Sequence, residues 1–450
     1  MDFPFSLPPV AEHDVIPPAK TDVVVIGGGV MGVMTAWFLR ERGLSVVLCE
    51  KGRVAAEQSS RNWGWVRQQG RDPAELPIMM EAMRIWQDLP ARTGEDLGFR
   101  QTGVLYIANR PEEMARHEAW AKIGAAHGTD TRVLSAAEVR GLMKDPGDWP
   151  GGIAGGIWTA SDARAEPWVA VPALARALVA KGGVVAERCA VRALDMVAGR
   201  VAGVVTERGR IACDSVVLAG GAWSALFLGR HGVMLPQLSV ISTAAATVPL
   251  PEHFAGAVAD GNFAFRRRAD GGYTLAPGEF REFTIGPHAF RSLRAFLPQV
   301  LKDPFGSRYL PAAPAGYPDA WGLKRRWGTE EETPFERMRI LNPRPNLKEL
   351  GKVQDSFARA FPAVGRPALK AAWAGMIDTM PDVVPVVDHV PALPGLVLAT
   401  GLSGHGFGIG PGMGRVVADL VNGGQVGHDL NRFRWSRFSD GSTLDLGPAL

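Results

Sequence analysis

A glycine-rich turn near the start of the chain constrains its fold more than any other feature. The apolar run Val23–Ile26 is typical of a buried strand, and an apolar stretch over residues 30–42 predicts a helix. Gly27, Gly29 and Gly32 lie between them at the spacing G-x-G-x-x-G. The first glycine permits a tight turn, the second lets the backbone approach a pyrophosphate, and the third lets the helix pack on the strand. The pattern predicts the start of a dinucleotide-binding fold.

The residues after this turn extend the same pattern. Gly43 is suited to end the helix, and residues 45–49 form an apolar run that predicts a second parallel strand. Glu50 ends that run, where a carboxylate can accept hydrogen bonds from both ribose hydroxyls of a dinucleotide. The further cofactor contacts expected in this region are Val30, Met31 and Lys51.

A second glycine-rich turn lies near the other end of the chain. Five glycines besides His405 occupy residues 401–410, after the apolar strand-like run 396–399. Backbone without side chains can lie close to a flat ligand, and Pro411 is suited to be the first residue of a helix that runs to about Asn422. The positive end of a helix dipole, directed at the pyrimidine edge of a flavin, would stabilise the reduced ring. Together the two turns favour one flavin bound by both ends of the sequence.

Composition excludes several other classes of protein. With 450 residues and 46% hydrophobic content, the chain can bury a large core and is typical of two domains. Lys and Arg outnumber Asp and Glu by only three and form no long basic block, so no nucleic-acid partner is indicated. No apolar run is long enough to cross a bilayer, and no metal site is predicted. The N-terminal arm, residues 1–20, has early acidic residues and several prolines, unlike a secretory signal.

Three cysteines, Cys49, Cys189 and Cys213, occur singly and mostly in apolar runs. This usage is typical of reduced core residues in a cytoplasmic protein.

The order of elements predicts an α/β chain, α+β overall, with a discontinuous nucleotide-binding domain. We assign residues 18–100, 151–235 and 371–440 to the FAD-binding domain, and residues 101–150 and 236–370 to a substrate-binding domain. Within the former, the strand 215–218 runs into the small residues Ala219, Gly220 and Gly221, which either approach the nucleotide or simply form a tight strand–helix turn. The role of residues 290–360 is left open.

Five motifs in order carry a resemblance to a known family. They are VVVIGGGVMG with Glu50, SSRNWGWVRQQG at 59–70, VLAGGAWS at 217–224, WAGMIDTMPD at 373–382 and the GLSGHGFGIGPGMG turn. With them the chain resembles the D-amino acid oxidase, glycine oxidase and sarcosine oxidase family of FAD enzymes over most of its length. The resemblance implies a Rossmann-type FAD domain with a parallel sheet, a substrate domain with a mainly antiparallel sheet and covering helices, and oxidation of a carbon–nitrogen bond.

The resemblance also implies particular cofactor contacts. Those lining the pyrophosphate and isoalloxazine would be Ser59, Ser60, Asn62, Gly64 and Trp65. Val191 would touch the adenine region through its backbone, and the adenosine would be bordered by Ala219, Gly220 and Trp223. The pyrimidine edge of the ring would be held by His405, Gly406, Phe407, Gly408 and Ile409. Gly401 and Gly404 of the same turn are further expected cofactor contacts. His405 is either an acid or base or, as we favour, a residue that orients the turn or contacts the cofactor.

The chain departs from the family pattern at two places. Monomeric sarcosine oxidases carry a cysteine that tethers FAD and a lysine after the GHGF turn, whereas here Gly408 follows Phe407 and no cysteine matches the tether. We therefore expect noncovalent FAD. Glycine oxidase-like chains continue W-A-G-x with an arginine that grips the substrate carboxylate, whereas Ile377 and Asp378 follow Met376 here.

Other residues can replace that missing anchor. Arg67 or Arg71 can form a bidentate pair with a carboxylate, unless they are solvated surface residues. Arg266, on an expected strand, either faces the cavity or belongs to a charged sheet edge. Asp378 either binds a substrate ammonium or, as slightly favoured, has a structural role.

The leading interpretation is an FAD enzyme that oxidises an amino acid or N-substituted amine and passes electrons to oxygen or to a carrier. The alternatives are a flavin-dependent oxidase of an amine without an α-carboxylate, and a flavoprotein subunit of a larger amine-dehydrogenase complex. An NAD-dependent dehydrogenase is disfavoured because it would leave the C-terminal turn without a role. Neither the exact substrate nor the oligomeric state follows from the sequence.

Overall fold

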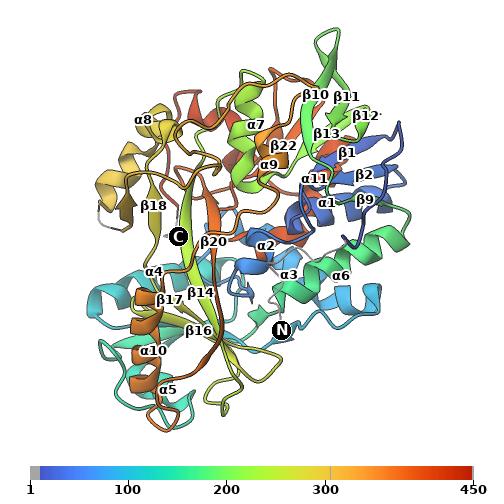
Figure 1. Ribbon diagram of the computed structural model, residues 1–450. Coiled ribbons are helices and arrows are strands. Elements are labelled where there is room, and N and C mark those ends of the chain that lie inside the picture. Colours follow the sequence, from blue (N-terminus) through green and yellow to red (C-terminus); the bar gives the residue numbers. More distant parts are fainter. Residues whose placement is uncertain (1–10, 305, 448–450) are drawn as a thin grey trace.

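The structure is a computed structural model that describes residues 11–304 and 306–447, so half of the expected N-terminal arm lies outside it. Two sheets organise the chain (Figure 1). The first has six strands in the order β21 (Val386–His389), β22 (Leu396–Thr400), β13 (Ser215–Leu218), β1 (Val23–Ile26), β2 (Val46–Cys49) and β9 (Val184–Ala186). All neighbours pair in parallel except β21, which is antiparallel to β22. Parallel strands of buried Val and Leu need cover on both faces.

Helices provide that cover on one face of the six-stranded sheet. They are α1 (Val30–Glu41), α3 (Leu76–Thr93), α6 (Pro167–Ala180) and α11 (Gly406–Asn422), which share one apolar core with Val23, Val25 and Leu48. The alternate residues Val24, Val47 and Val216 point to the other face. There they meet α7 (Ser224–Arg230) and the antiparallel strands β10 (Val191–Val197), β11 (Arg200–Thr206) and β12 (Gly209–Ala212). The expected Rossmann-type architecture is confirmed.

The second sheet has ten strands and is mainly antiparallel. Its path is β19 (Arg308–Leu310), β18 (Glu282–Thr284), β14 (Leu238–Thr247), β17 (Tyr273–Pro277), β16 (Phe263–Arg267), β15 (Ala257–Ala259), β5 (Val104–Ala108), β7 (Gly155–Thr159) and β6 (Thr131–Ser135), with β20 (Leu369–Thr379) paired to β14. The helix α10 (Leu347–Ala360) packs Val353 and Phe357 against Phe265 and Tyr273 of this sheet. The helices α4 (Pro111–Ala126), α5 (Ala136–Gly141) and α8 (Pro287–Lys302) lie at its margins (Figure 1).

Short elements join the two sheets. They are α2 (Gln58–Arg61), α9 (Pro334–Arg337) and a three-stranded sheet of β3 (Trp65–Val66), β8 (Ala163–Arg164) and β4 (Arg100–Gln101). Two strands within the ranges that we assigned to the FAD-binding domain, β7 and β20, pair in the ten-stranded sheet instead. Their local sequences are compatible with either sheet, so only the pairing with neighbouring strands shows which sheet each one joins. The remaining domain boundaries stay a prediction.

The C-terminal helix begins earlier than expected. We predicted Pro411 as its first residue, but α11 starts at Gly406 and includes Pro411 inside it. Proline removes one backbone hydrogen bond from a helix interior. Tertiary packing compensates, because Gly412 lies against Ile78 and Gly414 lies against Met34 where larger side chains would not fit. The prediction of the first helical residue was therefore wrong.

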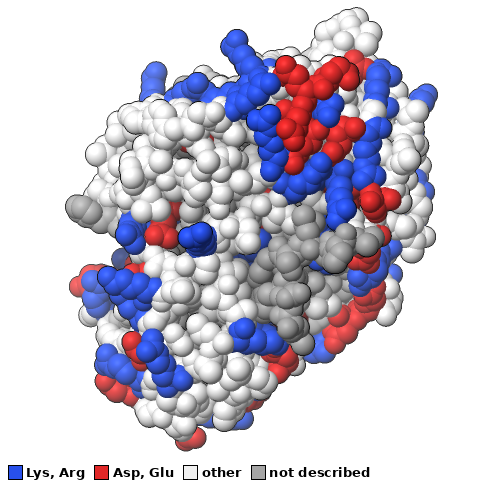
Figure 2. Space-filling view, viewed as in Figure 1, with Lys and Arg blue, Asp and Glu red and all other residues white. Residues whose placement is uncertain are grey.

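Among the described residues, no helix is long and apolar enough to cross a membrane. On the face shown in Figure 2, acidic side chains gather toward the upper right with basic ones beside them, and much of the remaining surface is uncharged.

Candidate active site

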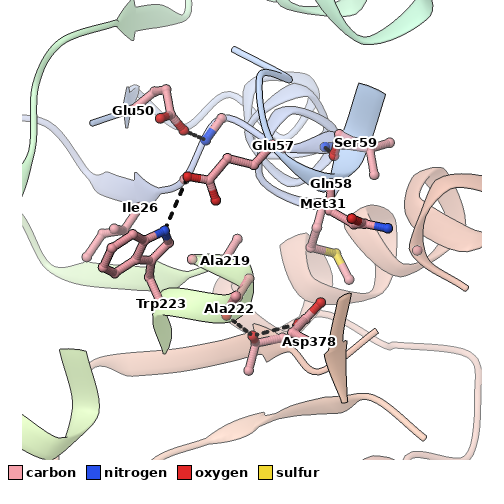
Figure 3. Close-up of a pocket in the computed structure, with 18 of the residues that line it drawn as sticks. Ile26, Met31, Glu50, Glu57, Gln58, Ser59, Ala219, Ala222, Trp223 and Asp378 are labelled. Atoms are coloured by element: carbon pink, nitrogen blue, oxygen red, sulfur yellow. Dashed lines mark hydrogen bonds between the residues drawn. The ribbon is translucent and has the colours of Figure 1, made fainter. Parts of the chain in front are cut away.

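One cavity is lined by both ends of the sequence. Its lining includes Val191 and Phe335 as well as Gly404 and Phe407. The glycine turn after β1 forms one wall, with Glu50, Glu57 and Ser59 arranged around it (Figure 3). A cavity with this lining fits a dinucleotide.

The glycine turn has the geometry that its spacing predicts. Gly27 has φ +113°, and a Cβ there would lie 2.4 Å from the carbonyl oxygen of Ala219. A Cβ at Gly32 would lie 1.9 Å from the carbonyl oxygen of Gly27. Neither contact is possible for a larger residue, so the crossing of β1, α1 and β13 requires glycine.

The N-terminus of α1 is open toward the cavity. Gly29 is its N-cap and provides no capping side chain, while the N–H of Val30 donates to Ser59 Oγ at 2.9 Å. A helix N-terminus with backbone N–H groups and a positive dipole end is suited to bind phosphate. The structure therefore brings Ser59, from α2, to the place where the expected pyrophosphate would lie.

Glu50 lies at the carboxyl end of β2, as predicted. Its Oε2 accepts from the N–H of Gly28 and its Oε1 from the N–H of Gly52, both at 2.7 Å. Burial raises the pKa of Glu50 to about 7, because the charged form loses its hydration. Each carboxylate oxygen can accept more than one hydrogen bond, so the group still fits a ribose diol.

A polar cluster that we did not predict lies next to Glu50. Lys51 Nζ lies 2.5 Å from Glu57 Oε1 and 4.6 Å from the centre of the Trp223 ring. Trp223 Nε1 donates to the same carboxylate oxygen at 3.2 Å (Figure 3). Glu57 therefore fixes two predicted cofactor residues, although it belongs to none of the motifs.

Asp378 connects the ten-stranded sheet to the C-terminal turn. Its Oδ2 accepts from the N–H of Gly401 at 2.8 Å and from Gln237 Nε2 at 3.3 Å. Burial raises the pKa of Asp378 to about 6. The carboxylate lines the cavity, yet these bonds also give it a structural role in holding the glycine turn.

Comparison with known proteins decides the family. The model of the DAO family, described as FAD-dependent oxidoreductases, matches residues 22–420. The chain belongs to this family. The glycine cradle, the open N-terminus of α1 and Glu50 fit the FAD on which this family of oxidoreductases depends.

Relatives support the assignment over different lengths of the chain. Mouse mitochondrial sarcosine dehydrogenase is 30% identical over 232 residues, which cover 50% of this chain but only 25% of that protein. The beta subunit of sarcosine oxidase from Rhizobium meliloti is 25% identical over 95% of this chain and 91% of its own length. The solved structure of L-amino acid deaminase from Proteus myxofaciens in complex with anthranilate has a TM-score of 0.89 and 28% identity, covering 96% of each chain.

His405 of the oxidoreductase lies behind the cavity wall. It is the N-cap of α11, and its Nδ1 lies 3.4 Å from Glu75 Oε2. Its backbone carbonyl accepts from Arg71 Nη2 at 3.0 Å. All three side chains are buried, and burial lowers the pKa of His405 to about 4. The imidazole is therefore neutral near pH 7, which supports the orienting role over that of an acid.

Arg67 lies half-buried beside an aromatic group. Its guanidinium carbon lies 5.6 Å from the centre of the Tyr106 ring, and its Nη1 donates to the carbonyl of Gln69. The rings of Trp63 and Trp65 meet edge to face at 5.3 Å. Both tryptophans pack in one cluster with Ala257 and Ala264 of the ten-stranded sheet, and Trp63 also packs against Ala244, Ala246 and Ala276. Small side chains on the sheet thus face large aromatic ones.

Arg266 is not free to bind a substrate. It is fully buried, and its guanidinium forms a bidentate pair with Glu166 at 2.9 and 3.0 Å. Its Nε also donates to the carbonyl of Trp63 at 2.6 Å. The expected ligand role is therefore corrected to a supporting one, because Glu166 and the backbone occupy the guanidinium.

The structure brings many of the predicted cofactor residues to one cavity. Those that line it are Gly27, Gly29, Val30, Met31, Glu50, Lys51, Ser59, Asn62, Val191, Ala219, Gly220, Trp223, Gly404, Gly406 and Phe407. The other predicted cofactor residues are not part of this lining, namely Gly32, Ser60, Gly64, Trp65, Gly401, His405, Gly408 and Ile409. Lining residues that sequence reasoning missed include Glu57, Gln58, Phe335, Met376 and Leu402. Phe335 comes from the region 290–360, where no motif marked it.

Proposed function

We propose that this protein oxidises the carbon–nitrogen bond of an amino acid or N-substituted amine with noncovalent FAD. The observation that supports the proposal best is the single cavity lined by the glycine turn of β1 and by Gly404–Phe407. When bound, FAD would supply the hydride acceptor for this two-electron oxidation. The substrate nitrogen loses a proton to solvent, and the resulting imine adds water and releases a carbonyl product and ammonia or a smaller amine.

The chain's own residues would hold the cofactor and exclude water. The open N-terminus of α1 and Ser59 are suited to the pyrophosphate, and Glu50 to the adenosine ribose. The N-terminus of α11 begins at Gly406, and its dipole would stabilise negative charge on the pyrimidine edge. Cys49 lines the cavity next to Glu50, the residue suited to the adenosine ribose and not to the flavin ring, which supports noncovalent binding.

We place the substrate at the aromatic group of Trp63, Trp65 and Tyr106, on the side where Arg67 lies. Arg67 is the candidate carboxylate anchor because its guanidinium lies at this group and only its Nη1 has a hydrogen-bond acceptor among the described residues. A planar guanidinium suits a carboxylate. The similar L-amino acid deaminase was solved with anthranilate, which is a carboxylate, and this supports an anionic substrate group.

The alternatives have less support. An amine without a carboxylate would need Asp378 as its ammonium partner, but Gly401 and Gln237 already donate to one oxygen of that group. A subunit of a larger complex is favoured only by the similarity to a sarcosine oxidase beta subunit. Oxygen and an electron carrier both remain candidates for the acceptor.

An anaerobic absorbance assay tests the proposed reaction. FAD-loaded protein is mixed with D- and L-amino acids, N-methyl amino acids and simple amines, and air is then admitted. Loss of the oxidised flavin band identifies the substrate class, and rapid return of the band in air identifies an oxidase. If none of these compounds bleaches a fully loaded protein, the proposed function is wrong.

Arg67→Ala tests the carboxylate anchor. We expect KM for the best amino acid to rise about tenfold to a hundredfold, because a charge-assisted bidentate contact is lost. A decarboxylated analogue should show little change. Arg84→Ala is the matched control, because Arg84 is exposed on α3. An unchanged KM for the amino acid would remove Arg67 from the substrate site.

A further inference from the structure

A second cavity of about 330 Å³ lies beside the flavin cavity. It is bounded by α7, the start of β14, β18, the first turn of α8 and residues 318–326. Ala222 and Met376 line both cavities, so the two share a wall. Three arginines, Arg291, Arg325 and Arg326, line the second cavity, which we call the arginine pocket.

The charges of the arginine pocket are unbalanced. Asp319 is the single carboxylate among the residues that line it, and that carboxylate already accepts hydrogen bonds from the protein. Its Oδ1 accepts from Arg325 Nη2 at 3.1 Å and from the N–H of His288 at 2.8 Å. Arg291 and Arg326 are exposed, and within residues 11–304 and 306–447 neither forms an ion pair or hydrogen bond. Two guanidiniums without partners on one cavity are suited to an anion.

The rest of the lining is largely uncharged and apolar. Leu226 and Val233 are buried, and Phe283 and Pro318 complete a hydrocarbon surface. His288 Nε2 lies 2.8 Å from the carbonyl oxygen of Leu235, and burial lowers the pKa of its imidazole, so it adds no charge near pH 7. The ligand chemistry that fits is an anionic head with an apolar body.

The shared wall is fixed by hydrogen bonds. Gln237 lines the arginine pocket, and its Nε2 donates to Thr400 Oγ1 at 3.0 Å and to Asp378 Oδ2 at 3.3 Å. Its Oε1 accepts from the N–H of Ala225 at 3.1 Å. Asp378 and Thr400 line the flavin cavity, so this amide joins the linings of the two cavities.

We propose that the arginine pocket is a second ligand site, which binds a small organic carboxylate next to the flavin cavity. Arg291 and Arg326 hold the carboxylate, and the apolar body of the ligand lies against Leu226 and Phe283. The site is separate from the one that we propose for the oxidised substrate at Arg67.

Calorimetric titration of the FAD-loaded protein with 2-naphthoate tests this site. We expect binding to weaken at least tenfold in Arg291→Ala/Arg326→Ala and to persist in Arg84→Ala and in Arg67→Ala. Both pocket arginines are exposed and lack partners among the described residues, so the double variant should keep its flavin and thermal midpoint.

A ligand control needs no variant. 2-Naphthol has the same rings without the carboxylate and should bind the unmodified protein at least tenfold more weakly than 2-naphthoate. Failure of 2-naphthoate to bind, equal binding of the two ligands, or an unchanged affinity in the double variant would each overturn the proposal. Loss of binding in Arg67→Ala alone would place the naphthoate in the substrate site and overturn it as well. None of these results depends on whether an amine bleaches the flavin.

Discussion

At the scale of single residues, His405 is held in its neutral form by its surroundings. Its imidazole is buried against Glu75, with Arg71 beside it, and its pKa falls from 6.5 to about 4. Between these values the unfolded chain binds a proton that the native protein does not. This residue therefore raises the free energy of unfolding as pH increases from 4 to 6.5, by about 3 kcal/mol at most. The same contribution is lost as pH falls from 6.5 to 4.

His405→Gln should reduce this dependence on pH. We expect the difference in thermal midpoint between pH 5 and pH 7 to become smaller, while the pH profile of kcat keeps its shape. Flavin fluorescence on heating and steady-state kinetics measure the two effects. If the substitution removed an ionisation between pH 5 and 8 from the kcat profile, His405 would be an acid or base after all.

At the scale of elements, the packing of α11 on α1 depends on glycine. A Cβ at Gly414 would lie 2.7 Å from the Cβ of Met34 and 2.8 Å from its backbone carbonyl carbon. Backbone atoms cannot move aside as the end of a flexible side chain can. Gly414→Ala should therefore lower the free energy of unfolding by about 1–3 kcal/mol and weaken FAD retention. Gly141→Ala is the matched control, since that helical glycine has open space around it. Equal thermal midpoints for the two variants would contradict this account.

At the scale of the whole molecule, FAD should stabilise both ends of the chain together. The cavity joins the turn after β1 to the turn before α11, although these lie far apart in the sequence. FAD at a hundredfold excess over its Kd raises the free energy of unfolding by about 2.7 kcal/mol. We expect hydrogen exchange to slow in residues 27–32 and 401–407 when FAD is added, and not when NAD is added. Protection of the first segment alone would mean that the C-terminal turn does not hold the cofactor.

The sequence by itself determined the elements whose signals are local. The turn after β1, the position of Glu50 and the strand Ser215–Leu218 follow from the spacing of glycines and apolar residues, because each requirement is met within a few residues. The ordered motifs extended this to the family and the cofactor. The local rule failed at Pro411, because Phe407 and Ile409 join the apolar core and Gly410 packs against Val30, so α11 is already formed before the proline.

Only the tertiary structure decided the partners of the charged residues. In the sequence, Arg266 and Arg67 were both candidate ligands for a substrate carboxylate. In the structure Glu166 pairs with Arg266, whereas Arg67 lies beside the ring of Tyr106. Phe335 reaches the cavity from a region without a motif. A charged side chain takes its role from the groups that neutralise it, and these come from distant segments. The sequence gives the chemical type and the spacing of these side chains. Their desolvation and their ion pairs arise only when the sheets pack together.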